Sequence, residues 1–467
     1  MNTLMFMRRG FTAIYLCLIA GMACESLAQE SFPLGILGGR GEVTAGSPLL
    51  TVKSLIGNSP AEIAGLLPGD QILAIDGIEF QPHSNRVDDG GSGPQRALGE
   101  RLDTVAGRAQ KSERVIALKV QRGTGESGEI LDIPCALPMR QGVLTSVGRN
   151  ELISRAAAHL RKTCQPAGFW NAPVGLTGDR VLTAWATVAL KAVGEPQDVE
   201  LMRRNVNWLM GPQQRCWLPE DLLEKGPDNL GNWALASGVV ALVEVTEGKP
   251  NRFQKAAIAV SCEALGQRMT PQGRFGHDVV VGYSGKGFNV INTLSHLAWA
   301  MGAKAGVAID QPVWNLSLQQ IKQSIDPNGG VRYWTMANTG TADASLRTSS
   351  MALALGLVGS EQALLETLSE YLDQHRARTR EAHAVGSLGM LLAPAAIWRH
   401  DRDAYQRFMQ EWRWYLSLMQ DHEGTVHYIG GKRNNGGDDY LGKDRIACVI
   451  AIMLLSPERE NLLLFQK

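Results

Sequence analysis

The sequence predicts a chain in two parts: a small, mostly-β domain, and then an all-α (α/α)6 toroid, which is a closed double ring of six helix pairs. Helix-like segments recur in pairs about every fifty residues from Asn150 to Leu455. In each pair an amphipathic segment precedes a more apolar, Ala- and Leu-rich one, the pattern of outer and inner helices. Short apolar runs separated by turn residues precede this repeat. A closed ring implies a central funnel, so we expect any chemistry where the inner helices begin.

The composition supports two folded domains and argues against a polyanionic partner. The chain has 467 residues, of which 44% are hydrophobic, enough for more than one sizeable core. It carries 46 Lys and Arg residues against 46 Asp and Glu residues, so its net charge is zero. This balance does not attract nucleic acid or an anionic membrane surface. We therefore expect no nucleic-acid partner.

The first residues are typical of a signal peptide. Arg8 and Arg9 precede an apolar run from Phe11 to Ala23, and the small residues up to Ala28 suit a cleavage site. This run is too short to cross a bilayer, and no later apolar stretch is long enough. We expect residues 1–28 to be removed and the protein to be secreted or periplasmic, with no transmembrane span afterwards.

Cysteine usage leaves two questions open. Cys24 is an alternative lipid-attachment site, although Gly21 stands where a large aliphatic residue is usual. The cysteines after residue 28 are odd in number and widely spaced, without a C-x-x-C pair, which favours buried thiols with room for one disulfide. They are Cys135, Cys164, Cys216, Cys262 and Cys448.

Residues 32–137 are expected to form the mostly-β domain. The runs from Leu49 to Leu55 and from Val115 to Gln121 are typical of strands. The most specific local signal lies between them, from Asn58 to Gly77, and reads N-S-P-A-E-I-A-G-L-L-P-G-D-Q-I-L-A-I-D-G. Its order of helix start, turn, strand and turn is that of a compact β-rich module.

This run resembles the PDZ family almost position for position. Ser59 suits the N-cap of a short helix, and Pro60 suits its first turn. The residues from Leu67 to Asp70 turn the chain into a strand, and Asp76-Gly77 makes the next tight turn. The resemblance implies a PDZ-like fold and a binding mode in which a peptide adds as an extra strand.

The same resemblance implies where the ligand binds. Backbone N–H groups of a Gly-containing loop would hold the carboxyl terminus of a peptide or protein partner. The matching residues are Leu34, Gly35, Ile36 and Leu37. A long polar insert from His83 to Gly93 departs from the family pattern. The alternative is therefore a PDZ-shaped spacer that docks on the toroid without a free peptide ligand.

Residues 138–149 are expected to be a linker, and residues 150–467 the toroid. The predicted outer helices are 150–164, 198–210, 253–268, 312–325, 361–376 and 402–420. The predicted inner helices are 179–193, 229–245, 288–304, 343–358, 383–398 and 442–455.

Gly-aromatic loops recur between the helix pairs. They begin at Gly168, Gly273, Gly330 and Gly424, which are 105, 57 and 94 residues apart, or about two, one and two repeat units. Such loops are similar to those of the terpenoid cyclase and protein prenyltransferase superfamily of α/α toroids. The whole arrangement resembles a family of exported bacterial proteins, chiefly of the planctomycete type, that join a PDZ module to such a toroid. These resemblances imply a fold and leave the function open.

The motifs of two toroid enzyme classes are incomplete. Asp438-Asp439 lacks the Asp-x-Asp-Asp form that a cyclase needs to protonate a double bond. A prenyltransferase-like zinc site needs Asp, Cys and His ligands, and no Cys stands near His277, His383 or His427 in sequence. We expect neither a metal nor another cofactor.

Polar residues at helical spacing mark two inner helices. Asn289, Asn292 and His296 share one helix face, and Asp343 and Arg347 share a face of the next inner helix. An unpaired buried polar group costs about 1–3 kcal/mol, so these residues either face the lumen or satisfy one another between helices.

Together with nearby loop residues they form the candidate catalytic set, which could provide a base, an acid and a cation. Its members are His277, Tyr283, Asn289, His296, Arg347, His383 and Asp439. Such a set suits β-elimination from, or hydrolysis of, a polysaccharide. Two hypotheses follow: a non-catalytic binding protein with a peptide at the PDZ groove, or an enzyme with a lumenal site for a carbohydrate or isoprenoid-like ligand. The absence of a complete catalytic motif favours the first.

Overall fold

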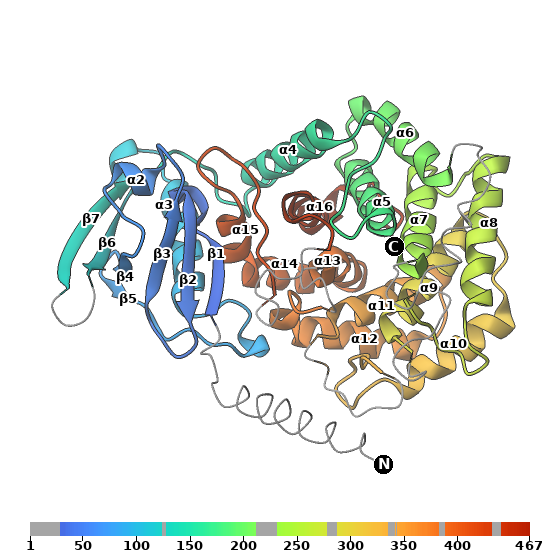
Figure 1. Ribbon diagram of the computed structural model, residues 1–467. Helices are drawn as coiled ribbons and strands as arrows, with labels where there is room; N and C mark the ends of the chain where they lie inside the picture. Colours follow the sequence, from blue (N-terminus) through green and yellow to red (C-terminus); the bar gives the residue numbers. More distant parts are fainter. Residues whose placement is uncertain are drawn as a thin grey trace, which may run out of the picture.

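The computed structural model describes residues 29–123, 128–211, 231–277, 287–334, 341, 343–382, 388–431 and 440–467. A β-sheet with short helices lies on one side and a ring of helices on the other (Figure 1). The predicted leader, with Cys24 inside it, lies outside the described residues. Within the described part, no helix combines the length and apolarity needed to cross a membrane.

The N-terminal module, which we define as the described residues from Gln29 to Leu137, contains one antiparallel sheet. Its described strands run in the order β1-β2-β3-β4-β6-β7, and β5 pairs with β4. They are β1 (Gln29–Pro33), β2 (Gly39–Thr44), β3 (Leu50–Leu55), β4 (Gln71–Ile75), β5 (Ile78–Glu79), β6 (Val115–Arg122) and β7 (Glu129–Ala136). Their buried side chains make the core of the module.

The local structure expected for the run Asn58–Gly77 is present. The Ser59 side chain accepts a hydrogen bond from the Glu62 N–H and caps α2 (Pro60–Ile63), with Pro60 at its first position. Asp70 then closes the following turn by accepting the Leu67 N–H at 2.9 Å. Asp76 and Gly77 have φ of 51° and 76°, as a tight hairpin between β4 and β5 requires. These local predictions are confirmed.

A helix absent from the prediction follows the polar insert. Helix α3 (Gly93–Ala106) buries Leu98, Leu102 and Val105, a spacing that places them on one face. The insert itself is not a solvated loop throughout, because His83 is only 3% exposed.

The ring consists of the predicted helix pairs. The outer helices are α4 (Ser146–Thr163), α6 (Val199–Met210), α8 (Arg252–Gln267), α10 (Gln311–Gln323), α12 (Gln362–Gln374) and α14 (Arg402–Glu411), which α15 (Arg413–Met419) continues. The inner helices are α5 (Leu176–Val193), α7 (Gly231–Val245), α9 (Asn289–Lys304), α11 (Ser345–Val358), α13 (Gly389–His400) and α16 (Lys443–Leu455). Each inner helix packs against the next, and α16 packs against both α13 and α5, which closes the circle.

The last outer helix differs from the prediction of one helix over 402–420. It breaks at Trp412 into α14 and α15, and α15 packs on α3, on β1 and on the short 3-10 turn Gly35–Leu37. Because of this break, α15 contacts both the ring and the N-terminal module.

Two inner helices of the ring are buried on every side. Every residue of α7 from Gly231 to Glu244 is buried, and so is every residue of α9 from Asn289 to Gly302. Both helices are thus enclosed along almost their whole length by other parts of the chain.

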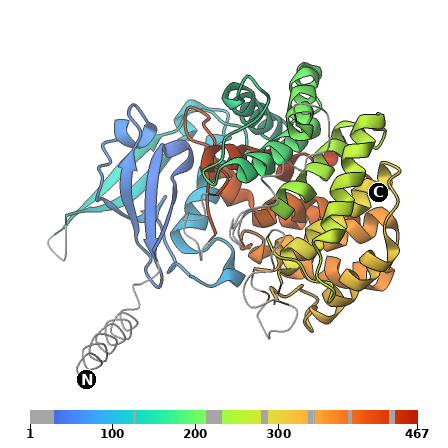
Figure 2. The same cartoon turned by 45° about the vertical axis from the view of Figure 1, so that its right-hand side comes forward.

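Close backbone packing fixes the module on the ring. Figure 2 shows α3, in light blue, between the sheet and the ring. A Cβ atom at Gly99 of α3 would lie 2.6 Å from the carbonyl oxygen of Trp414, and one at Gly91 would lie 2.2 Å from the Trp414 ring. Only glycine permits this approach.

Candidate functional site

Four equivalent turns precede inner helices of the ring. Each has a glycine with positive φ: Gly168 (89°), Gly273 (79°), Gly329 (93°) and Gly424 (89°). In each turn, the residue three positions before the glycine donates its N–H to the carbonyl of the residue that follows the glycine, at 2.8 to 3.1 Å. The turn glycine of the third loop is thus Gly329 and not Gly330, because only Gly329 takes the left-handed conformation. The predicted repeat is confirmed with this correction.

Two asparagines tie these loops to the starts of inner helices. Asn232 of α7 donates its backbone N–H to His277 O and its side-chain N–H to Gly276 O, both at 3.0 Å. Asn289 of α9 repeats this arrangement one unit later, with bonds to Tyr333 O at 3.2 Å and Arg332 O at 2.9 Å. The Asn289 side chain is therefore engaged in holding a loop.

An aromatic run crosses the ring mouth, which we define as the end of the ring where α7, α9 and α11 begin. The His277 ring centroid lies 6.3 Å from that of Trp233 and 4.2 Å from that of Phe288. The Trp334 centroid lies 4.9 Å from that of Phe288 and 4.6 Å from that of Tyr333. Phe288 is buried, whereas His277, Tyr333 and Trp334 are partly exposed. We call these five residues the mouth cluster.

Arg347 of α11 stands next to this cluster. Its Nε donates to Val331 O at 2.9 Å, its Nη2 donates to Asp343 Oδ1 at 2.8 Å, and its guanidinium carbon lies 5.4 Å from the Tyr333 ring centroid. The side chain is 0% exposed. Its Nη1 has no hydrogen-bond partner among the described residues. A buried donor without an acceptor is costly, which makes it a marker for a missing oxygen.

The hydrogen bond on His277 determines what this side chain offers. Trp233 Nε1 donates to His277 Nδ1 at 2.9 Å. Because indole N–H is only a donor, neutral His277 carries its proton on Nε2. In this state His277 presents a donor at Nε2, whereas a general base requires a nitrogen lone pair.

The structure places His296 away from the ring mouth. It is 0% exposed and lies between two tryptophan rings, Trp299 of α9 and Trp314 of the outer helix α10, with centroids 5.3 and 4.2 Å away. Burial lowers its pKa to about 3. His296 therefore faces the outer helices and not a lumen. Asn292 also points away from the axis, because its side chain donates to Gly273 O at 3.2 Å.

Of the remaining candidates, three cannot be placed. Tyr283, His383 and Asp439 lie outside the described residues. The ring mouth thus brings together His277, Asn289 and Arg347 of the predicted set, and it separates His296 from them. The prediction missed Trp233, Phe288 and Trp334. Trp334 follows the third of the Gly-aromatic loops, whereas no motif in the sequence marks Trp233.

The loop predicted to hold a peptide carboxylate is covered by the ring. Leu34, Gly35, Ile36 and Leu37 are all buried. A Cβ atom at Gly35 would lie 2.9 Å from the carbonyl oxygen of Ser417 in α15.

The strand that follows this loop has no free edge. β2 pairs with β3 on one side and over five residues with β1 on the other, in a register that sets Phe32 opposite Gly41. A peptide that added to the β1 side of β2 would have to displace β1.

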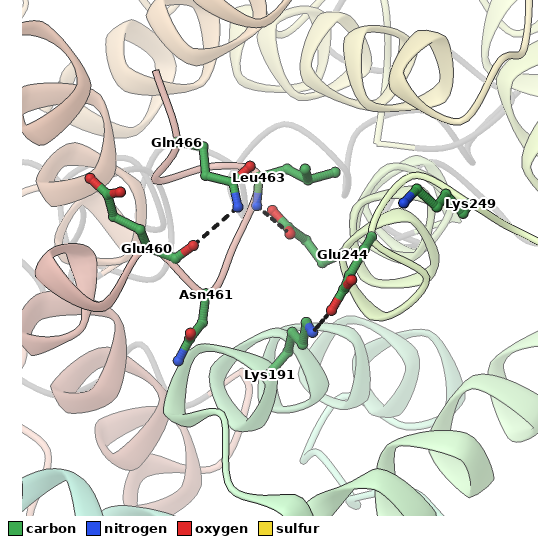
Figure 3. Close-up of a pocket in the computed structure, with 8 residues that line it drawn as sticks. Lys191, Glu244, Lys249, Glu460, Asn461, Leu463 and Gln466 are labelled. Atoms are coloured by element: carbon green, nitrogen blue, oxygen red, sulfur yellow. Dashed lines mark hydrogen bonds and ion pairs between the residues drawn. The ribbon is translucent and has the colours of Figure 1, made fainter.

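A concave site of about 350 Å³ lies at the opposite end of the ring (Figure 3). Its central carboxylate, Glu244 of α7, accepts the backbone N–H groups of Leu463 and Leu464 at 2.8 and 2.9 Å. Burial raises the Glu244 pKa to about 7. Lys191 pairs with Glu247 at 2.5 Å. Glu244 thus anchors the C-terminal tail, which gives its carboxylate a structural role.

Metal and thiol chemistry find little support in the described residues. They include no cluster of three or more His, Cys, Asp and Glu side chains placed to hold a metal ion. Burial raises the pKa of Cys135 and Cys262 to about 12 and that of Cys164 to about 11, which keeps these thiols protonated.

The helical ring defines the family of the protein. The chain belongs to the family described as a domain of unknown function, DUF6288, which matches residues 153–465. No curated protein matches the chain.

Solved structures with a similar arrangement of helices include enzymes with different activities. A glycosyl hydrolase of family 88 from Bacteroides vulgatus is 12% identical, with 68% of this chain and 99% of that chain covered and a TM-score of 0.46. A possible member of family GH105 from Klebsiella pneumoniae is 13% identical, with 68% and 95% covered and a TM-score of 0.45. A type II terpene cyclase from Scytonema is 12% identical, with 67% and 100% covered and a TM-score of 0.39.

Proposed function

We propose that the ring mouth binds a ligand with a flat, weakly polar face and an anionic group, and that this ligand is an acidic saccharide. The observation that carries the proposal is Arg347 Nη1, a buried donor without a partner among the described residues. A guanidinium whose other nitrogens are fixed by Val331 and Asp343 is oriented in advance to donate to a carboxylate.

The mouth cluster supplies the second half of this recognition. Tyr333 and Trp334 are partly exposed and belong to a continuous aromatic surface beside Arg347. Ligand sites commonly combine such apolar walls with a few fixed polar groups. A sugar ring packed on the aromatic faces, with its carboxylate toward Arg347, uses both features.

Binding rather than turnover fits the chemistry of His277. Its Nδ1 accepts from Trp233, so the neutral side chain carries its proton on Nε2 and has no lone pair there to act as a base. Proton abstraction, which a lyase requires, would need the lone pair that this bond occupies.

The N-terminal module is proposed to be a PDZ-like domain that works as a docking element of an exported protein. The capped helix α2, the turn closed by Asp70 and the hairpin at Asp76-Gly77 support this proposal. Its loop around Gly35 faces the carbonyl of Ser417, and β1 takes the edge of β2. These contacts favour a spacer held in place on the ring over a receptor for free peptide termini.

Titration with digalacturonate, followed by tryptophan fluorescence and calorimetry, tests the saccharide proposal. We expect Arg347→Met to weaken binding about tenfold or more and Arg347→Lys to restore part of it, because the charged hydrogen bond from Nη1 is lost and then partly replaced. Cellobiose, which carries no carboxylate, serves as the neutral control ligand.

Trp334→Ala provides a second variant in case Arg347→Met does not fold, because Trp334 is partly exposed. Equal binding of digalacturonate to the wild type and both variants would overturn the proposal. Tighter binding of farnesyl diphosphate than of digalacturonate would replace the saccharide by an isoprenoid ligand.

A further inference from the structure

A buried polar cluster connects the first strand to the ring. The Glu30 carboxylate on β1 accepts from Gln95 Nε2 of α3 at 2.8 Å, faces His83 Nε2 at 3.2 Å, and pairs with Arg380 of the ring. Arg380 also donates to Gln95 Oε1 at 3.4 Å. Glu30 and Arg380 are 5% and 1% exposed. Buried charges of this kind are held by all their partners together, so the cluster fixes the position of each member.

Arg380 belongs to loop 376–382, which joins α12 to the segment before α13. The module holds this loop at a second point, because Arg378 pairs with Asp88 of the polar insert. The Arg380 guanidinium carbon also lies 5.6 Å from the ring centroid of Trp414. One side of the loop is therefore clamped by residues of the module and by α15.

The other side of the same loop meets the ring mouth. Ala382 forms an antiparallel bridge with Ala344, directly before α11. Gly389, at the start of α13, leaves no room for a Cβ atom, which would lie 2.0 Å from Thr379 O and 3.2 Å from the Ser345 side chain. The loop is thus packed tightly against the first residues of both helices.

Ala344 stands between Asp343, which binds Arg347, and Ser345, where α11 begins. We propose that Glu30 is a positioning residue for the ring mouth: through Arg380 and loop 376–382 it fixes the start of α11 and so the direction of the Arg347 side chain. The N-terminal strand thereby sets the geometry of the ligand site without touching the ligand. The effect on ligand affinity rests on the proposed function, whereas the coupling between strand and ring mouth does not.

Hydrogen–deuterium exchange of the full chain tests the coupling without any ligand. Glu30→Gln removes the charge and keeps the shape of the side chain. We expect exchange to become about tenfold faster or more in residues 376–382 and 343–348, because each loses a clamp. Asp103→Asn is the matched control, since Asp103 also joins module to ring, through Arg413 at 2.6 Å, but does not touch loop 376–382. It should leave both segments within about twofold of the wild type.

The exchange data can overturn the proposal in two ways. Faster exchange in 376–382 with unchanged exchange in 343–348 would break the link between loop and mouth. Equal acceleration in both variants would reduce Glu30 to a general docking contact. If Glu30→Gln does not fold, Arg380→Lys replaces it, because it keeps the charge and shortens the reach.

Digalacturonate titration gives the functional readout, for variants whose melting temperatures match that of the wild type. We expect Glu30→Gln to weaken affinity about fivefold or more and Glu30→Asp to restore part of it, as for couplings through a packed network. Unchanged affinity in Glu30→Gln would overturn the positioning role. If the wild type binds no digalacturonate, the proposed ligand is wrong and the exchange experiment still decides the coupling.

Discussion

Glu30 of the first strand and Arg380 of the ring form an ion pair in which both side chains are almost fully buried, at 6% and 1% exposure. Burial alone would raise the pKa of Glu30, but the charge of Arg380, with hydrogen bonds from His83 and Gln95, lowers it to about 2. The carboxylate is therefore ionised at neutral and mildly acidic pH. The N-terminal module and the ring bury the Glu30 carboxylate together, and neither part could bury this charge by itself.

Arg380→Met should destabilise the protein by about 3–5 kcal/mol, because it leaves the Glu30 carboxylate buried and without its countercharge. Urea unfolding measures this loss. Arg96→Met is the control: Arg96 also bridges to the ring, through Glu411 at 2.8 Å, but its side chain is 34% exposed. An exposed pair is worth about 1 kcal/mol or less. Equal losses in the two variants would contradict the importance assigned to burial.

Glu244 should make stability fall as the pH rises from about 4.5 to 7. Its pKa goes from an ordinary value of 4.5 to about 7 in the folded state, because of burial. The folded protein therefore binds more protons than the unfolded chain in this window, and the contribution is lost as pH rises through the folded value. At 1.36 kcal/mol per unit the change is about 3 kcal/mol.

Urea unfolding between pH 4.5 and 8 checks the Glu244 prediction. Glu244→Gln should flatten the decline, whereas Glu247→Gln should not, because the Glu247 side chain in the same cavity is 66% exposed. An unchanged slope in Glu244→Gln would show that another group causes the pH dependence. The opposite slope that Glu30 produces lies below pH 4.5, outside this window.

His296→Phe should keep or raise stability, by up to about 2 kcal/mol, because it removes a buried imidazole whose two nitrogens lack partners among the described residues. It should not change digalacturonate binding. Asn289→Leu is the contrasting variant: it leaves Arg332 O without its donor and should cost about 1–3 kcal/mol. Thermal unfolding distinguishes the two variants. A large loss of stability in His296→Phe would show that the fold or the function needs this histidine.

Gly99→Ala should loosen the module from the ring. The new methyl group would lie 2.6 Å from Trp414 O and 2.9 Å from Trp414 Cα, so backbone must move, at about 1–3 kcal/mol. Gly107→Ala, at the end of the same helix, is the control, because its nearest neighbour lies at 3.5 Å and its φ is −75°. Calorimetry compares the melting temperatures of the two variants. An unchanged melting temperature in Gly99→Ala would mean that the contact between α3 and α15 is loosely packed.

The architecture was predictable because the inner and outer helices of the ring have different hydrophobicity patterns in the sequence. Inner helices such as α7 are mostly apolar and their outer partners are amphipathic, so pairing and order follow from the hydrophobicity pattern. Helix α3 was missed because Gly93 and Pro94 open it and the surrounding segments favour strands. Its spacing of Leu98, Leu102 and Val105 was the available signal.

The site was predictable only in part, because periodicity assigns residues to a common face without saying what that face meets. Asn292 and His296 do share a face, but it turns toward a loop and toward α10. Arg347 could be found through its spacing of four from Asp343 on a predicted inner helix, and the two side chains do pair. The contact between Glu30 and Arg380, 350 positions apart, had no signal in one sequence.

Helix α16 completes the circle between α13 and α5, and this decides when the ring can mature. Until residues 443–455 leave the ribosome, the apolar flanks of α5 and α13 have no neighbour to cover them. Closure then joins segments far apart along the chain, which is an intrinsically slow step. A premature stop codon shortly before α16 would remove little of the chain. It would nevertheless leave an open arc of helices whose exposed apolar surface promotes aggregation.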